Sequence, residues 1–121
     1  MAYRTEFTTF AVKIGMEAKA EEWMQIVRER QGECVETLER EKMHYECIFK
    51  VFRNGRMYLS WFSVQSTDGR KVEDSPHPID HVHLAYWNQC IDKQVAPEDF
   101  EHVVSFVPRS VREAIEARDL L

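Results

Sequence analysis

The chain has 121 residues, which is enough for one domain with a single hydrophobic core. Hydrophobic residues make up 44% of it and charged residues 31%, so a folded rather than a disordered chain is expected. The formal net charge is -5, from 21 acidic and 16 basic residues, which argues against nucleic acid and anionic membranes as partners.

Localisation can be predicted from what the sequence lacks. No apolar run approaches the roughly 20 residues that cross a bilayer, and the first residues lack the layout of a signal peptide. Cys34, Cys47 and Cys90 are odd in number and form no C-x-x-C pair, which is typical of free thiols in a reducing compartment. We therefore expect a cytoplasmic protein with one domain over residues 1–121.

The first two elements differ in hydrophobic period. Residues 5–14 alternate between two sets of side chains, which predicts a strand that ends at Gly15. From residue 17 to about residue 41 the apolar residues recur at helical spacing. Gly32 interrupts this segment and costs about 1 kcal/mol relative to alanine, so a bend or two shorter helices are expected.

Residues 44–65 predict a hairpin around Asn54-Gly55, because a type I′ turn needs positive φ at both central positions. This turn pairs Arg53 with Arg56 and fixes the register. One side is nearly all apolar, and we expect it to pack against helices: Tyr45, Cys47, Phe49, Val51, Tyr58, Ser60, Phe62 and Val64. The other side is mixed, which suits a protein interface or a ligand cavity: His44, Glu46, Ile48, Lys50, Phe52, Met57, Leu59, Trp61, Ser63 and Gln65.

The second half of the chain predicts a loop, a helix, a strand and a helix. Residues 66–75 are polar and turn-rich, and the helix after them begins at Pro78 and continues to about residue 93. Residues 102–107 predict a fourth strand. Ser110 followed by Glu113 forms a capping-box pattern, which predicts a last helix over residues 110–120.

This order predicts an α+β fold of the ferredoxin-like β-α-β-β-α-β type, with an antiparallel four-stranded sheet and an extra C-terminal helix. The two helices within that pattern cover only one face of the sheet. The simplest cover for the other face is a second copy of the chain, so a homodimer is expected.

Over roughly residues 7–107, this element order resembles the dimeric α/β-barrel superfamily, and most of all its small bacterial families without an assigned function. Known members include cofactor-free monooxygenases, stress-response proteins, muconolactone-isomerase-like enzymes and L-rhamnose mutarotase. The resemblance implies a homodimer whose two sheets close into a shared barrel, and it implies no cofactor.

The layout is also similar to that of L-rhamnose mutarotase in its interrupted first helix, its aromatic-rich hairpin and the adjacent aromatics Tyr86 and Trp87. That enzyme uses a tyrosine near its second strand, and Tyr45 lies near that position. It also uses a histidine on its first helical segment, whereas this chain has no histidine in residues 17–42.

The first candidate site is the mixed side of the hairpin. His44 and Glu46 lie two apart on one strand and project to the same side, so they could donate and accept protons as a catalytic pair. Trp61 offers an apolar platform for a ring, and the further candidate ligand-binding residues are Lys50, Tyr45 and Trp87. The alternative is an interface patch in which Glu46 pairs with Lys50.

A second cluster contains His77, Asp80, His81 and His83. Histidines at i and i+4 together with an aspartate could hold zinc or iron if they shared a helical face. However, Pro78 places the start of the helix after His77, and His81 and His83 project about 200° apart. The alternative is a set of ordinary surface residues without a metal.

Three hypotheses follow from these residues and the resemblance. The leading one is a homodimer that binds a small organic molecule, with isomerase- or mutarotase-like chemistry on a small sugar or lactone. The second is a cofactor-free monooxygenase-like barrel enzyme. The third is a non-catalytic binding or structural dimer, in which the second face of the sheet is only an interface.

Overall fold

A computed structural model describes residues 3–66 and 75–119 of the chain, so most of the predicted loop at 66–75 lies outside the described residues. The predicted class is confirmed, because four antiparallel strands combine with helices that include one at the C-terminal end. The elements are β1 (Tyr3–Ala11), α1 (Glu17–Glu29), α2 (Gln31–Glu41), β2 (Met43–Arg53), β3 (Arg56–Ser66), α3 (Pro78–Cys90), β4 (Glu98–Asp99) and α4 (Arg109–Asp119).

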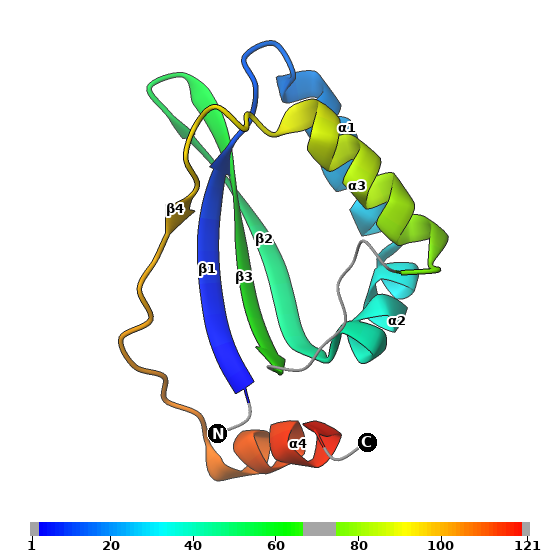
Figure 1. Ribbon diagram of the computed structural model, residues 1–121, viewed down its shortest axis with the longest axis vertical. Coiled ribbons are helices and arrows are strands. Elements are labelled where there is room, and N and C mark those ends of the chain that lie inside the picture. The colour runs from blue at the N-terminus through cyan, green and yellow to red at the C-terminus, as the bar shows by residue number, and fades with distance from the viewer. Residues whose placement is uncertain (1–2, 67–74, 120–121) are drawn as a thin grey trace.

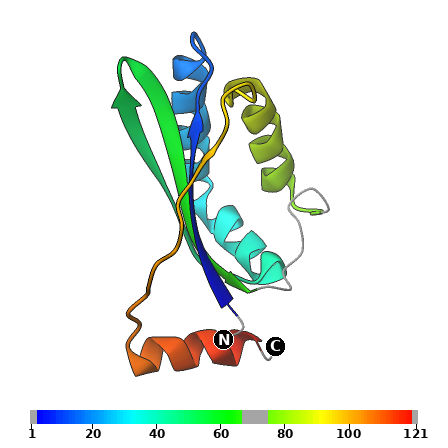
Figure 2. The same cartoon turned by 60° about the vertical axis from the view of Figure 1, so that its left-hand side comes forward.

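The strands are arranged in the order β2-β3-β1-β4, so β2 and β4 form the two edges of the sheet. Helices α1, α2 and α3 lie together on one face of the sheet, while α4 lies across one end of it (Figure 1). Turning the molecule shows the same separation, and within residues 3–66 and 75–119 no helix lies over the middle of the other face (Figure 2). The sheet therefore has one helix-covered face and one open face.

The predicted hairpin register is confirmed over most of its length. Asn54 and Gly55 have φ values of 53° and 77°, as a type I′ turn requires, and Arg53 pairs with Arg56. The register changes only at the start of β2, where an irregularity between Met43 and Tyr45 pairs Gln65 with Met43 instead of His44. His44 therefore occupies a β-bulge and leaves the regular alternation of the strand.

The two sides of the hairpin are used in the opposite way to the prediction. The mixed side faces the helices and forms the core, in a cluster of buried residues that contains Val12, Ala20, Trp23, Met24, Met57, Leu59, Cys90 and Ile91. The apolar side is the open one, and its Tyr45, Phe49 and Val51 are exposed. The right-handed crossover between the parallel strands β1 and β2 determines which face the helices cover, whereas the prediction relied on composition.

The first helical segment is divided into two helices, as one of the two predicted alternatives. The break lies at Arg30, whose φ and ψ are -106° and 31°, so Gly32 falls in the first turn of α2. Two predicted boundaries were too long, because β1 ends at Ala11 instead of residue 14 and α3 ends at Cys90 instead of about residue 93. α4 begins at Arg109, which places Ser110 inside the helix and not at its cap.

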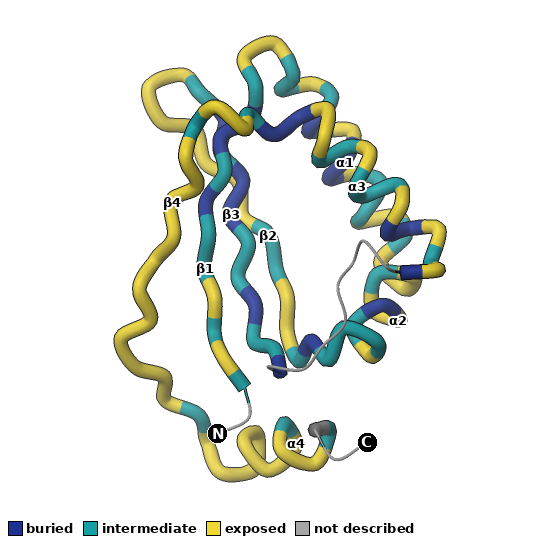
Figure 3. The backbone as a smooth tube through the Cα atoms, viewed as in Figure 1, coloured by how far each residue is buried: buried dark blue, intermediate teal, exposed yellow. Residues whose placement is uncertain are grey.

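The predicted strand over residues 102–107 does not form. β4 contains only Glu98 and Asp99, and the Phe100 amide donates to the Phe7 carbonyl at 2.9 Å before the chain leaves the sheet. Residues 100–107, called the arm below, then run as extended chain to α4, and all of them except the half-buried Val107 are exposed (Figure 3). A strand-like pattern becomes a strand only where another strand offers its edge, and the arm has none beside it among the described residues of its own chain.

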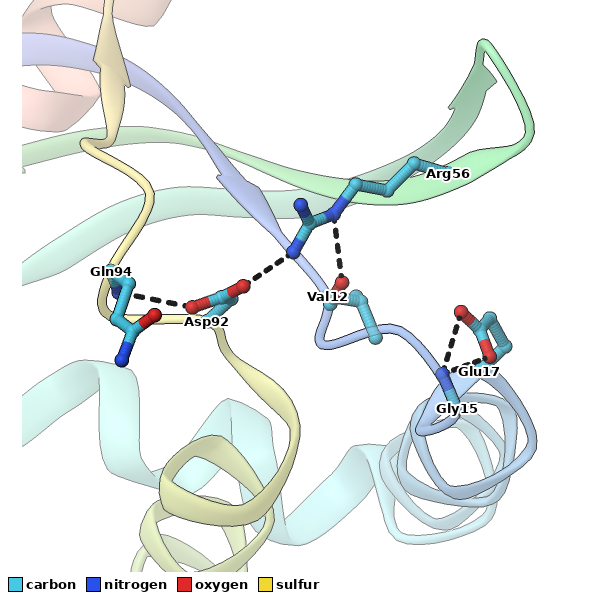
Figure 4. A network of polar contacts seen from close by, with 6 residues as sticks. All are labelled: Val12, Gly15, Glu17, Arg56, Asp92 and Gln94. Carbon is cyan, nitrogen blue, oxygen red and sulfur yellow. Dashed lines mark hydrogen bonds and ion pairs between the residues drawn. The ribbon is translucent and has the colours of Figure 1, made fainter.

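A polar network fixes the end of the sheet where β1 leads into α1 (Figure 4). The Arg56 guanidinium donates to the Val12 carbonyl at 3.2 Å and forms a 2.6 Å ion pair with Asp92, just after α3. Arg56 holds the pKa of Asp92 below its ordinary value by hydrogen bonding. This contact connects the hairpin to the end of α3.

Candidate functional site

His44, the first predicted catalytic residue, is part of a structural network. Its Nε2 lies 3.0 Å from the Ser66 hydroxyl, and its Nδ1 accepts a hydrogen bond of 3.0 Å from Arg118 of α4. The same guanidinium donates to the Met43 carbonyl at 2.9 Å and pairs with Glu39 at 3.0 Å. Because both ring nitrogens have partners, His44 connects α4 to the sheet instead of facing a ligand beside Glu46.

Glu46, the second predicted residue, lies on the helix-covered face within range of other acids. Desolvation is the largest cause that raises the pKa of its carboxyl group, followed by the negative charge of Asp80. Glu46 still has exposed surface, so protein atoms surround the carboxyl group without sealing it from water. A carboxyl group that is accessible and has a raised pKa keeps its proton to a higher pH than an ordinary glutamate and can act as a general acid.

Asp80, in the first turn of α3, contributes to raising the pKa of two neighbouring glutamates, Glu46 and Glu41. Its side chain is 6% exposed, and its Oδ2 has no hydrogen-bond partner among the described residues. Its charge also contributes to raising the pKa of Glu41 in α2 to about 7, where desolvation is the larger cause. Buried oxygens are nearly always hydrogen-bonded, so the Asp80 Oδ2 is an exception that needs an explanation.

His83 lies one turn after Asp80 on α3. The indole Nε1 of Trp23 donates to the Nδ1 of His83 at 3.1 Å, so a neutral His83 carries its proton on Nε2. Burial lowers the pKa of His83 despite the opposing charge of Asp80, which keeps the ring neutral. Glu41, Glu46, Asp80 and His83 are called the acid cluster below.

Tryptophan side chains adjoin the acid cluster. The Trp61 ring lies 6.1 Å from His83 and 5.6 Å from Trp23, and Trp87 lies 5.2 Å from Trp61. Two predicted ligand-binding residues, Trp61 and Trp87, are therefore brought together on the helix-covered face. Aromatic rings beside carboxyl groups form a site with both an apolar surface and polar contacts.

Two other predicted ligand-binding residues lie away from the acid cluster. Lys50 forms a 2.7 Å ion pair with Glu21 of α1, which replaces the alternative pairing of Lys50 with Glu46. Tyr45 lies on the open face, with its ring 6.0 Å from Phe62. The strand alternation already separated Tyr45 from Glu46, so they do not act on one ligand within one copy.

The predicted metal alternative has no geometric support in residues 3–66 and 75–119. No group of three or more His, Cys, Asp or Glu side chains there is placed to hold a metal ion. His81 is exposed, whereas Asp80 is buried, and His77 precedes the first residue of α3.

The cysteines are free thiols, as predicted. Burial is the largest cause that raises the pKa of Cys34, Cys47 and Cys90. A nucleophilic thiol needs the opposite shift, because the thiolate is the reactive form.

The open face carries a concave feature. A groove of about 480 Å³ lies between the sheet and the start of the arm, lined by Thr5, Phe7, Tyr45, Cys47, Phe49, Phe62, Phe100, Glu101, His102 and Val103. Its aromatic rings contact each other, with Phe7 4.8 Å from Phe100 and 6.3 Å from Phe49. The groove is mainly apolar, unlike the acid cluster on the other face.

The residues that the sequence analysis missed come from the helices. Asp80 and His83 were considered only as metal ligands, although their i, i+3 spacing places them on one side of α3, toward which Trp87 also projects. Glu41 lies in the helical segment predicted over residues 17–41, and no sequence signal distinguishes it from the other glutamates of α2. Its proximity to Asp80 depends on how α2 and α3 pack.

A family model described as a family of unknown function (DUF6176) matches residues 3–113. No curated protein and no solved structure matched the chain. Within residues 3–66 and 75–119, no helix has the length and apolar character needed to cross a membrane.

Proposed function

We propose that this chain, which belongs to DUF6176, a family of unknown function, binds a small organic molecule at the acid cluster and transfers protons to and from it. The observation that carries the proposal is the buried Asp80 Oδ2, which lacks a hydrogen-bond partner among the described residues, close to Glu46 and His83. A buried carboxylate oxygen without a partner is destabilising, and a ligand that donates a hydrogen bond to it would remove that cost.

Glu46 and Asp80 have the properties of an acid and base pair. Two carboxyl groups that interact do not ionise independently, so the charge on Asp80 favours a proton on Glu46. Opening the ring of a small sugar or lactone needs one group that donates a proton to the ring oxygen and another that accepts one from a hydroxyl group or from water. In this proposal Glu46 donates and Asp80 accepts.

The neighbouring side chains supply recognition. The Nε2–H of neutral His83 is a donor suited to a hydroxyl or carbonyl oxygen, since Trp23 occupies the Nδ1. Trp61 offers an indole surface for the apolar side of a sugar ring. This combination favours a hydroxylated ring over a purely apolar ligand.

The test follows proton-transfer turnover by NMR exchange between sugar anomers and by ring opening of aldonolactones. The wild-type protein should accelerate at least one member of a panel of reducing sugars and aldonolactones. Glu46→Gln and Asp80→Asn should each lower that acceleration by about 10²- to 10⁴-fold, which is the range for loss of general acid or base catalysis.

Glu36→Gln is the matched control, because Glu36 is an exposed glutamate on α2. It should leave both turnover and stability unchanged. The proposal is wrong if no compound in the panel reacts faster with the wild-type protein. It is also wrong if Glu46→Gln and Asp80→Asn react at the wild-type rate while remaining folded.

The same proposal includes a homodimer that covers the open face. Tyr45, Phe49, Phe100 and Phe106 are each about half or more exposed. At roughly 150–250 Å² for each aromatic side chain, covering them would remove about 500 Å² of apolar surface from water. A stable interface needs about 800 Å² per partner, so these rings supply more than half.

Sedimentation equilibrium tests the dimer. The wild-type chain should be dimeric at micromolar concentration, and Phe49→Lys on the open face should weaken association by at least tenfold. Val35→Lys is the matched control, since Val35 is an exposed apolar residue on α2, away from the open face. A wild-type chain that stays monomeric at about 100 µM would contradict this part of the proposal.

A further inference from the structure

The arm has the sequence of a strand but lacks strand contacts. Val103 and Phe106 are 87% and 89% exposed, and Val104 is 59% exposed. The backbone hydrogen bonds between the described residues include none from residues 101–107. Isolated surface apolar residues are ordinary, but three within four residues of extended chain indicate a missing neighbour.

The opposite edge of the sheet, formed by β2, lacks a neighbouring strand among the described residues. β2 pairs only with β3, so its outer edge has no strand beside it among the described residues. This edge strand is 11 residues long, and it exposes Phe49 toward the open face and Phe52 toward the helix-covered face. A long, apolar edge strand readily accepts another strand.

The arm and the β2 edge both carry apolar side chains on two sides. In an extended arm, Val103, Ser105 and Val107 project to one side, while Val104 and Phe106 project to the other. A strand with apolar residues on both sides suits a position that is covered on both faces. The β2 edge offers such a position, because Phe49 and Phe52 extend its apolar surface on both faces of the sheet.

The arm cannot reach the β2 edge of its own sheet, because it leaves from the β4 edge, with β1 and β3 between them. We propose that the arm of one copy pairs as an added strand with the outer edge of β2 in a second copy. Among the described residues each chain has one arm and one β2 edge without a strand beside it, so a two-fold dimer satisfies both at once. This inference rests on the proposed homodimer and adds a specific contact to it, the pairing of each arm with the β2 edge of the other copy.

The direction of pairing follows from α4. An antiparallel arm ends beside Met43, at the beginning of β2, and α4 follows the arm directly. Within one chain, Arg118 of α4 contacts the Met43 carbonyl at 2.9 Å, and pairing of the arm with a second copy would exchange this contact for the same contact between copies. The antiparallel direction therefore brings α4 to the end of β2 that it is built to contact, whereas a parallel arm would carry it to the Asn54-Gly55 turn.

The experiment is residue-resolved amide hydrogen exchange on the full chain. In the wild-type dimer, every second amide of residues 101–107 should exchange at least 100-fold more slowly than in an unstructured chain. In the monomeric Phe49→Lys variant this protection should be lost. Val104→Ala and Val104→Pro extend the test by sedimentation, because proline removes the amide donor at that position.

The possible outcomes separate this inference from the dimer. A dimer whose arm amides exchange without protection would overturn the arm pairing and leave the homodimer standing. Protection that persists in monomeric Phe49→Lys would also overturn it, since the arm would then contact its own chain. A wild-type chain that is monomeric would remove both proposals. Weakening of the dimer by Val104→Pro at least tenfold more than by Val104→Ala supports the arm pairing.

Discussion

The two faces of the sheet differ in a way that reverses the usual distribution of polar and apolar residues. The helix-covered face holds Asp80 and Glu46 beside Trp61, whereas the open face holds Tyr45 and Phe49 in contact with water. Burying a carboxyl group and exposing aromatic rings are both unfavourable. Each face therefore indicates a missing partner, a ligand on one side and a second copy on the other.

The largest expected effect comes from the core of the helix-covered face. Trp23 is fully buried, so Trp23→Ala should lower the free energy of unfolding by about 3–5 kcal/mol. Val51→Ala on the open face should change it by less than about 1 kcal/mol. Both are measured by urea unfolding in the monomeric Phe49→Lys background, and similar losses at the two sites would remove the contrast between the faces.

The next largest effect is a pH dependence of stability that comes from Glu41 in the acid cluster of the helix-covered face. The pKa of Glu41 is about 7 in the folded chain and ordinary when unfolded, so the folded chain keeps a proton that the unfolded chain releases. Stability should therefore fall by about 1–3 kcal/mol as the pH rises from about 4.5 to 7, a range that allows for solvent screening of a partly exposed group. Glu41→Gln should flatten this decline in urea unfolding measured at several pH values. An unchanged slope would show that the pKa of Glu41 is not raised in the folded chain.

Two glycines test the backbone independently of either face. Gly55 has a φ of 77°, so Gly55→Ala should lower the free energy of unfolding by about 1 kcal/mol despite open space for a methyl group. Gly32 has similar open space but lies in helix α2, so Gly32→Ala should raise it by up to about 1 kcal/mol. Effects of the same sign in thermal unfolding would contradict the assigned turn or helix.

The smallest effect should come from the ion pair at the end of the sheet. Arg56 lowers the pKa of Asp92 in the folded chain, so this contact stabilises the fold above the ordinary value of 3.8 and is lost as the pH falls through the lowered pKa. Arg56→Gln should lower the melting temperature at pH 7 more than at pH 2. An equal decrease at both pH values would mean that the charge of Asp92 is not involved.

Local sequence signals predicted local structure well. Asn54-Gly55 specified the hairpin turn and, through it, the pairing of Cys47 with Phe62 seven residues from that turn. The assignment of faces failed, because it depends on the handedness of a crossover and not on which side is more apolar. The fourth strand failed for a related reason, since the pattern in the arm describes a preference that this chain alone cannot satisfy.

For the proposed site, the sequence predicted which residues share a face of the sheet but not what covers that face. Glu46 and Trp61 were assigned to the correct strands and to one common face, whose helix cover was not foreseen. His44 was lost because a β-bulge moves it out of the alternation, and such a bulge has no clear sequence signal here. Asp80 and His83 joined the site through the packing of α3 against the sheet, which no local pattern describes.

The pairing of Glu46 with Asp80 is the central claim, and ¹³C NMR titration of the Glu46 carboxyl carbon tests it most directly. The pKa of Glu46 should lie above the ordinary glutamate value of 4.5, and Asp80→Asn should move it down toward that value because one of the two causes of its rise is removed. A Glu46 that titrates at the ordinary value in the wild-type chain, or that does not respond to Asp80→Asn, would contradict the proposed acid and base pair.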